Sequence, residues 1–240
     1  MSVISPDSIH GSTPNYQFKS SRLDPVIAAL LFLTFTTGLI DAVSYIGLGR
    51  VFTANMTGNV VLLGFAAAGV PGLSIARSLI SLGGFVFGAV AGGRLASSKA
   101  AANRRRWVVT AILCEAGLLA LAAVLAVGFD FNAGTPESRL YAIILATAIA
   151  MGLRNATVRH LGIADLTTTV LTLTLTGLAA DSSFAGANNP RWPRRLLSVI
   201  AMFAGAMIGA LILSRGLGLA LSMATVLAMA ASLLARRVSE

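Results

Sequence analysis

Two polar segments interrupt an otherwise apolar chain, and their residues could bind a solute. The first runs from Asp41 to Asn59 and is the densest polar stretch within the apolar regions. Glycines break its helical pattern, and Asn55 or Thr53 can accept a hydrogen bond from the first turn of a short helix that follows. Unpaired N–H groups and the dipole at such a helix start favour an anion or a carboxylate-bearing solute. The candidate substrate-binding residues here are Asp41, Ser44, Thr53, Asn55, Thr57, Gly58 and Asn59.

The second polar segment, residues 165–177, alternates threonine with apolar residues before a second short helix. Just upstream of it, Arg154 could contact an anionic substrate at the inner mouth of the protein. Two alternatives stay open: the threonine hydroxyls could bond back to carbonyls of their own helix, and Arg154 could be a cytoplasmic anchor for its span. The candidate substrate-binding residues of this half are Arg154, Asn155, Thr168, Thr169 and Thr172.

Asp41 and Glu115 are the acids deepest in apolar segments, where a charge costs about 2.5 to 3.5 kcal/mol on insertion scales. The functional interpretation is that each takes up and releases a proton. The alternatives are an ion pair with Arg50 or Arg154, or a protonated acid bonded to a backbone carbonyl. Asp41 and Glu115 are therefore the candidate proton-coupling residues.

The residue types that a catalytic or metal centre needs are scarce. The single cysteine, Cys114, lies within an apolar run, and the histidines are His10 and His160 alone. The sequence contains neither a Gly-x-Ser-x-Gly nor a His-Glu-x-x-His motif, and Asp41 with Asp165 is the only conceivable acid pair. We therefore expect no enzyme, no catalytic residue, no metal site and no cofactor.

The elements that position these residues must lie in a bilayer. The chain has 240 residues, of which 56% are hydrophobic and only 11% are charged, and its mean hydropathy is +0.82. A soluble domain carries about 25% charged residues, so the sequence indicates a multi-pass membrane protein. Its net charge of +9 comes from short clusters between apolar segments, which is typical of topology signals and not of a nucleic-acid interface.

Eight apolar segments could form helices, and two of them are too short to cross a bilayer. The second and the sixth have about 12 to 15 residues, or roughly 18 to 22 Å of helix, against a hydrocarbon core of about 30 Å. We expect these two to be broken or re-entrant helices. The segments are residues 25–48, 56–70, 79–96, 107–129, 141–158, 169–180, 196–213 and 217–235.

The distribution of Lys and Arg distinguishes six crossings from eight. With both short segments re-entrant and both termini in the cytoplasm, 14 of the 18 basic residues fall on the inner side, leaving only Arg50, Arg77, Arg139 and Arg215 outside. With eight full crossings the basic residues divide nine and nine, without bias. We therefore favour six spans in the bacterial cytoplasmic (inner) membrane, with eight crossings as the alternative.

The chain reads as two copies of one unit. A shift of about 114 residues places residues 38–42 over residues 152–156, and a shift of one residue more places Thr57 over Thr172. Three full spans per copy is an odd number, so the second copy would be inserted upside down, as in many secondary transporters. The expected fold is an all-α polytopic membrane protein of two inverted repeats. Its parts are a flexible cytoplasmic tail (1–24), repeat 1 (25–129), a loop (130–138) and repeat 2 (139–237).

Two glycine motifs, one in each predicted repeat, are typical of closely packed helices. They are Gly84-x-x-x-Gly88-x-x-x-Gly92 and Gly205-x-x-x-Gly209. We expect them to bring neighbouring helices together, and the same faces could support a homo-oligomer.

The stretch GLIDAVSYIGLGRVFTANMTGNVVLLG closely resembles the signature of the YoaK-like family of bacterial membrane proteins, domain of unknown function 1275. The resemblance extends over roughly residues 25 to 235 and includes GLRNATVRHLG and a segment that in this family tends to read Thr-Thr-x-x-Thr-Gly. Thr168, Thr169 and Thr172 fit this pattern, but Leu173 stands where the family usually has Gly, which would restrict close backbone approach there. The resemblance implies the class of protein and leaves the substrate open.

These features together predict a secondary transporter of a small anionic or polar solute, coupled to protons through Asp41. The two short helices would meet with their N-termini near the bilayer midplane, and rocking of the repeats would alternate access. The alternative functions are a non-catalytic membrane scaffold or partner subunit and, less favoured, an intramembrane enzyme. The expected partners are the lipid bilayer, an unidentified solute and a second copy of the chain, with no nucleic acid.

Overall fold

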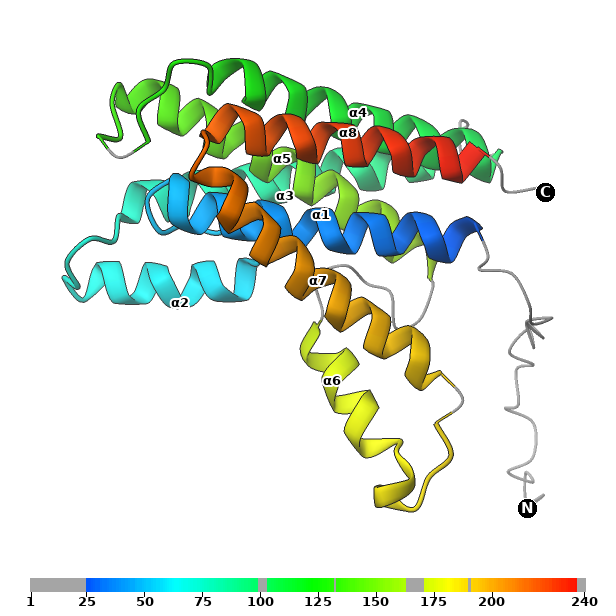
Figure 1. The fold of residues 1–240 in the computed structure, drawn as a ribbon. Coiled ribbons are helices and arrows are strands. Elements are labelled where there is room, and N and C mark those ends of the chain that lie inside the picture. Colours follow the sequence, from blue (N-terminus) through cyan, green and yellow to red (C-terminus); the bar gives the residue numbers. More distant parts are fainter. Residues whose placement is uncertain (1–24, 99–102, 132, 163–170, 190, 237–240) are drawn as a thin grey trace, which may run out of the picture.

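The computed structural model describes residues 25–98, 103–131, 133–162, 171–189 and 191–236, and within them every regular element is a helix (Figure 1). The tail predicted for residues 1–24 lies outside the described residues. In chain order the helices are α1 (Pro25–Gly47), α2 (Met56–Ala67), α3 (Ile75–Ser97), α4 (Arg104–Leu125), α5 (Glu137–Leu161), α6 (Leu171–Ala180), the short 3-10 helix η2 (Ser183–Ala185), α7 (Trp192–Leu213) and α8 (Leu217–Arg236).

Six of these helices are long and apolar enough to cross a bilayer, with spans of 20 to 25 residues, whereas α2 has 12 residues and α6 has 10. This confirms the predicted fold class of six full spans and two short helices. Some long helices begin earlier than their apolar runs because polar residues cap them. Ser74 accepts a hydrogen bond from the Arg77 N–H at 3.4 Å, and Asn103 accepts one from the Arg106 N–H at 2.8 Å.

α1 begins and α8 ends at the same end of the bundle (Figure 1), as six crossings require. α1 runs to the opposite end, and the chain then turns back through residues 48–55 so that α2 starts beside the middle of the bundle. α2 returns to the end that α1 has just reached, and α3 departs from there. The segment of residues 48–67 thus leaves one end of the bundle and returns to the same end, which is the path expected of a re-entrant helix.

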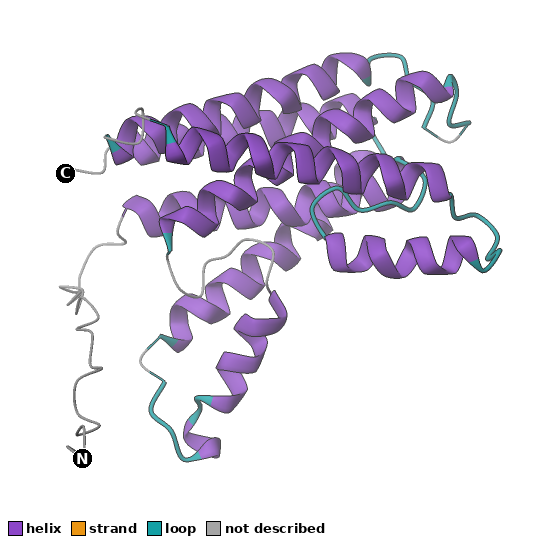
Figure 2. Cartoon of the chain, turned by 180° about the vertical axis from the view of Figure 1, so that it is seen from behind, coloured by secondary structure: helices purple, strands orange, loops and turns teal. Residues whose placement is uncertain are grey.

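α6 and α7 form a hairpin that tilts away from the other long helices (Figures 1 and 2). Arg195 of α7 donates hydrogen bonds to the Gly177 carbonyl oxygen, in the last turn of α6, and to the Asp181 carboxylate at 2.7 Å. A cation beside a helix C-terminus is stabilised by the helix dipole. Arg195 therefore fastens the second short helix to the span that follows it.

α1 and α5 are the central helices of the bundle. About two thirds or more of each span is buried, 67% for α1 and 72% for α5, against 22 to 39% for the other four. Large aliphatic side chains pack around α1 and α5. The core also contains alanines of α4 and α8, whose small side chains suit the packing of these two helices against each other. The buried polar residues of α1 and α5, among them Thr37, Asp41 and Arg154, therefore lie where lipid does not reach them.

Glycines bring α3 against α5. A Cβ atom at Gly88 would lie 2.1 Å from the Ile149 carbonyl oxygen, and one at Gly152 would lie 2.0 Å from the Phe85 carbonyl oxygen. Both distances are much shorter than a van der Waals contact, so only glycine permits this approach. The α3 glycine motif thus packs against α5 within a single chain, as its predicted packing role requires.

The contact between α1 and α7 has the same geometry. A Cβ atom at Gly205 would lie 1.9 Å from the Phe35 carbonyl oxygen, and one at Gly38 would lie 2.1 Å from the Met202 carbonyl oxygen. Other contacts are matched in the same way: α4 packs on α5 as α8 packs on α1, and α2 packs on α3 as α6 packs on α7. The helix contacts therefore come in pairs that relate α1, α2, α3 and α4 to α5, α6, α7 and α8.

The predicted meeting of the two short helices is not found among the described residues. Each short helix contacts the long helix that follows it, and α2 and α6 do not pack against each other. The physical reason is that side-chain hydrogen bonds fasten each short helix to its own span. Asn59 of α2 donates to Ser81 of α3 at 3.0 Å, and Arg195 binds the end of α6.

We expect Gly88→Ala to destabilise the protein, because the new methyl group would overlap the Ile149 carbonyl oxygen and push α3 away from α5. Overpacking of this kind costs about 1 to 3 kcal/mol, and the measurement is the melting temperature in detergent. Gly83→Ala is the matched control, since nothing lies within 4 Å of a Cβ atom at that position of α3. Equal melting temperatures for the two variants would contradict this packing.

Cysteine labelling in intact cells tests the number of crossings. Single cysteines replace Val70 and Ser214 at one end of the bundle, and Ser98 and Ala187 at the other, on a Cys114→Ala background. Six crossings put the members of each pair on one side, so we expect an impermeant maleimide to label positions 70 and 214 in intact cells, and the other two only after permeabilisation. Eight crossings separate positions 70 and 214, so labelling of one without the other would exclude six.

Candidate functional site

One face of α1 carries the buried polar residues Thr34, Thr37, Asp41 and Ser44. Their spacing of three or four residues places them on one side of the helix. Thr34 and Thr37 each donate to the carbonyl oxygen four residues earlier at 2.9 Å, and Ser44 donates to the Asp41 carbonyl oxygen at 3.2 Å. The three hydroxyl groups thus donate within α1, whereas the Asp41 carboxylate binds groups outside the helix.

Glu115 of α4 and Arg154 of α5 form an ion pair in the core of the bundle, and each side chain is only 1% exposed. Arg154 also donates to the Leu33 carbonyl oxygen at 2.8 Å and to the Thr37 hydroxyl at 2.9 Å. Charges at this depth are costly unless they are paired and hydrogen-bonded. One guanidinium therefore joins α1, α4 and α5, and its charge is balanced by Glu115.

Asp41 lies against the start of the short helix α2. Its carboxylate accepts hydrogen bonds from the backbone N–H groups of Ala54 and Asn55, and it interacts electrostatically with Arg154. Asn55 caps the same helix, with its Oδ1 accepting from the Gly58 N–H at 3.1 Å, which confirms one of the two predicted caps. The affinity for an anion predicted at this helix start is therefore met by a carboxylate of the chain itself.

Three buried polar atoms of this region have no hydrogen-bond partner: Asp41 Oδ1, Thr53 Oγ1 and Arg154 Nε. Thr53 directly precedes the two residues whose N–H groups bind Asp41. Buried polar atoms are nearly always satisfied, and those that are not mark positions of strain, of function or of a bound ligand. We call these three residues the Asp41 cluster, and their free hydrogen-bonding capacity suits a small polar ligand.

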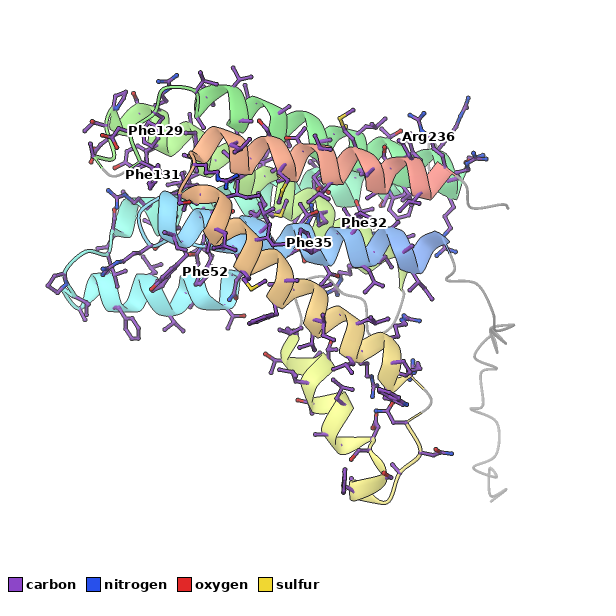
Figure 3. The ribbon with its side chains drawn as sticks, in the orientation of Figure 1. Phe32, Phe35, Phe52, Phe129, Phe131 and Arg236 are labelled. Carbon is purple, nitrogen blue, oxygen red and sulfur yellow. The ribbon has the colours of Figure 1, made fainter. Side chains whose placement is uncertain are left out.

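The loop that carries Thr53 is held by two polar side chains. Asn59 of α2 bonds both backbone groups of Phe52, and Ser81 of α3 donates to the Phe52 carbonyl oxygen at 2.6 Å. The Phe52 ring stacks on that of Tyr45 with centroids 5.0 Å apart, and Figure 3 shows Phe52 beside the start of α2. Backbone that leaves a helix at membrane depth must be satisfied by the protein, and these contacts satisfy both backbone groups of Phe52.

The structure thus divides the binding residues predicted for the first segment. Asp41 and Thr53 belong to the Asp41 cluster, whereas the two asparagines and Ser44 make the structural contacts described above. Thr57 is exposed on α2, and Gly58 packs under the Phe52 ring, where a Cβ atom would lie 2.9 Å from ring carbon Cδ2.

In the second segment, the predicted residues Thr168 and Thr169 lie outside the described residues. Thr172 is exposed on α6, and its carbonyl oxygen accepts a hydrogen bond from the Thr176 hydroxyl at 2.9 Å. The alternative that threonines bond back within their own helix therefore applies to Thr176.

The two candidates next to each other on α5 have different surroundings. Arg154 is 2% exposed and lies inside the bundle, not at its mouth. Asn155 is half-buried and donates to the Met151 carbonyl oxygen at 2.8 Å. Arg154 is also the ion-pair partner of Glu115. An ion pair with this arginine is one of the alternatives that the sequence leaves open for a buried acid.

Sequence reasoning missed Thr37 and Ser81. Thr37 precedes Asp41 by one helical turn, and that spacing was a signal that both lie on one face of α1. Ser81 carries no comparable signal, because its contact with Phe52 joins residues 29 positions apart in the chain.

Comparison with known proteins shows which family the chain resembles. Residues 29–234 match the family described as protein of unknown function, DUF1275. The chain is 34% identical over 192 residues to the UPF0700 transmembrane protein YoaK of Bacillus subtilis, an alignment that covers 76% of this chain and 81% of that protein. No solved structure matches the chain significantly.

A comparison of a single with a paired substitution tests the buried ion pair. We expect Glu115→Gln to lower the free energy of unfolding by about 3 to 5 kcal/mol, because it leaves the Arg154 charge buried without a counter-charge. The paired change Glu115→Leu with Arg154→Met removes both charges and should recover most of that loss. Melting temperature in detergent is the measurement, with exposed Glu137→Gln as the control. A Glu115→Gln variant that melts like the unaltered protein would rule out the pair.

Proposed function

The chain belongs to the DUF1275 family and crosses a membrane several times, and on that premise we propose that it is a secondary transporter of a small anionic or polar solute, coupled to protons. The observation that carries the proposal is the Asp41 cluster. A buried carboxylate with an unpartnered oxygen faces the start of a broken helix, next to a buried arginine.

The cluster suggests how a proton and an anion are coupled. While Asp41 is ionised, its carboxylate occupies the N–H groups of Ala54 and Asn55 and adds a negative charge beside Arg154. Protonation removes that charge and weakens the carboxylate as an acceptor, so the helix start becomes available to another anion. A solute anion therefore binds best together with a proton, which is the coupling that a proton symporter needs.

The Glu115–Arg154 pair sets the charge of the site. Because Glu115 balances Arg154, the surroundings of Asp41 have little net charge before the proton arrives. Protonation of Asp41 then leaves an excess of positive potential from the helix dipole of α2, and the incoming anion balances it. We infer that Glu115 positions and neutralises Arg154, and that Asp41 carries the transported proton.

The matched helix contacts support alternating access as the mode of transport. α1 with α7 and α3 with α5 are two equivalent glycine-mediated pairs, and each carries one short helix beside it. In transporters built from inverted repeats, exchange of two such equivalent arrangements opens the site to either side. We propose that the two halves are inverted repeats that rock in this way.

Orientation follows from charge. The end of the bundle where α1 begins and α8 ends carries Arg94, Arg104, Arg105, Arg106, Arg159 and Arg236, whereas the other end carries Arg50, Arg77, Arg139 and Arg215. The positive-inside rule places the more basic end in the cytoplasm. We propose that the protein lies in the bacterial cytoplasmic membrane with both termini inside, and that it is a carrier and not an enzyme.

Proton flux in proteoliposomes tests the coupling. Vesicles loaded with the pH indicator pyranine receive an inward gradient of nitrate, chloride, phosphate, succinate or lactate, with protein-free vesicles subtracted. We expect at least one anion to acidify the lumen, and Asp41→Asn to reduce that acidification to less than about a tenth, because an amide cannot carry the proton.

Ser44→Ala is the matched control for Asp41→Asn, since it alters a buried polar residue one turn along the same helix whose hydroxyl bonds only within α1. It should acidify the vesicles at the unaltered rate. Acidification by Asp41→Asn equal to that of the unaltered protein would refute proton coupling through Asp41. A correctly folded protein that moves none of the five anions would instead favour a scaffold.

A further inference from the structure

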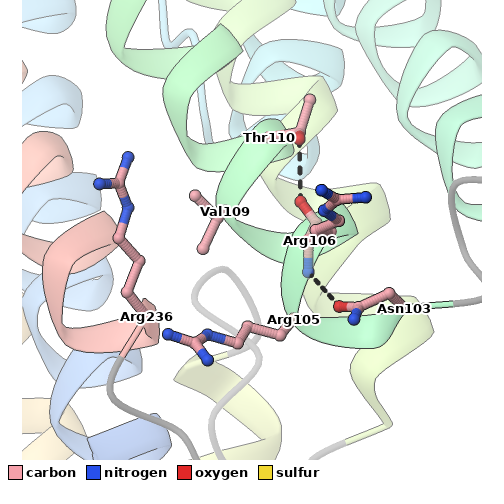
Figure 4. Close-up of a pocket in the computed structure, with 6 residues that line it drawn as sticks. All are labelled: Asn103, Arg105, Arg106, Val109, Thr110 and Arg236. Atoms are coloured by element: carbon pink, nitrogen blue, oxygen red, sulfur yellow. Dashed lines mark hydrogen bonds between the residues drawn. The ribbon is translucent and has the colours of Figure 1, made fainter.

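A pocket of about 370 Å³ lies between the start of α4 and the end of α8, away from the Asp41 cluster (Figure 4). Arg105 and Arg106 come from the first turn of α4, and Arg236 comes from the last turn of α8. Val109 lies between the two helices in this view, and the Arg105 side chain extends toward the end of α8. Three exposed guanidinium groups therefore line one pocket, although Arg236 lies 130 residues after Arg106 in the chain.

No acid of the described residues balances these three charges. Asp41 and Glu115 are buried in the middle of the bundle, and Asp181 pairs with Arg195. Asp130 and Glu137 lie at the opposite end of α4 and α5, where Figure 3 shows Phe129 and Phe131. The pocket is thus a concentration of positive charge that the described part of the chain leaves without a counter-ion.

The helix dipole makes this concentration more costly. Arginines in the first turn of α4 add positive charge to the end of a helix that is already positive, which is the unfavourable orientation. Asn103 caps the helix by accepting from the Arg106 N–H, and it supplies no charge. An anion bound in the pocket would be stabilised by the guanidinium groups and by the dipole together.

We propose that this pocket binds the phosphate headgroup of an anionic phospholipid in the leaflet that faces the terminal end of the bundle. Guanidinium groups present paired N–H donors whose geometry matches phosphate oxygens, which favours phosphate over other anions. Basic pockets between membrane helices on the cytoplasmic side are suited to such headgroups.

The surroundings of the pocket indicate a lipid and not a free phosphate. Leu113 follows Thr110 by one turn on α4 and is 41% exposed, and Leu233 precedes Arg236 by one turn on α8 and is 58% exposed. Both lie on the faces that carry the pocket and lead from it into the depth of the bilayer. The arginines thus receive the headgroup, and these leucines contact its acyl chains.

Native mass spectrometry of the full-length protein in detergent, titrated with phosphatidylglycerol, tests the assignment. The pocket variant is Arg105→Gln with Arg236→Gln, and the control is Arg94→Gln with Arg159→Gln. The control removes two exposed arginines from the same end of the bundle, outside the pocket. Each arginine near the membrane surface adds to the attraction for anionic lipid. Loss of two should therefore weaken the binding of phosphatidylglycerol to the pocket variant about thirtyfold. The control should bind phosphatidylglycerol like the unaltered protein.

Two further titrations distinguish the sources of phosphate. Phosphatidylcholine should bind weakly to all three proteins, and inorganic phosphate at the same concentrations should not compete with phosphatidylglycerol. Effective competition by inorganic phosphate would overturn the lipid assignment in favour of a soluble phosphate. Equal loss of binding in the pocket variant and the control would overturn the pocket itself. Melting temperature without lipid verifies that each variant is folded.

Discussion

The buried pair of Glu115 and Arg154 is the interaction on which the arrangement of the site depends. Lipid offers no hydrogen bonds, so a charge in the middle of the bundle must find its partners on neighbouring helices. Arg154 finds them on α4 and on α1, through Glu115, Thr37 and the Leu33 carbonyl oxygen. These contacts fix the relative positions of α1, α4 and α5, and they bring a positive charge close to Asp41.

The same constraint explains the broken helix. Where residues 48–55 leave helical geometry, each backbone group needs a partner other than water. Asn59 and Ser81 supply partners for Phe52, and Asp41 supplies one for the start of α2. Asn59 and Ser81 are therefore structural parts of the site, because their side chains bond the Phe52 backbone. Within this loop Thr53 is buried, and its hydroxyl has no hydrogen-bond partner.

Local features were predictable from the sequence, and contacts between distant helices were not. The number and length of the spans follow from apolar runs, and the Asn55 cap follows from a residue type at a helix start, since both depend on neighbours in the chain. The sequence offered Arg50 or Arg154 as the partner of a buried acid. The choice of Arg154 for Glu115 depends on how α4 and α5 are rotated against each other, which no local pattern specifies. The separation of α2 from α6 likewise depends on the tilt of α7 and on the hydrogen bonds that bind each short helix to its span.

The two halves share their helix packing but differ in the residue at one matching position, and this difference bears on which half can carry a proton. The predicted repeat places Asp41 over Asn155, and the glycine contacts around both positions are equivalent. An amide at position 155 supplies hydrogen bonds but cannot exchange a proton, and Asn155 uses its N–H in a bond to Met151. Glu115 is held by Arg154, so among the described residues Asp41 is the buried acid with an unpartnered oxygen. In the proposed carrier, Asp41 is therefore the candidate coupling group, and Asn155 at the matching position of the second half does not provide another.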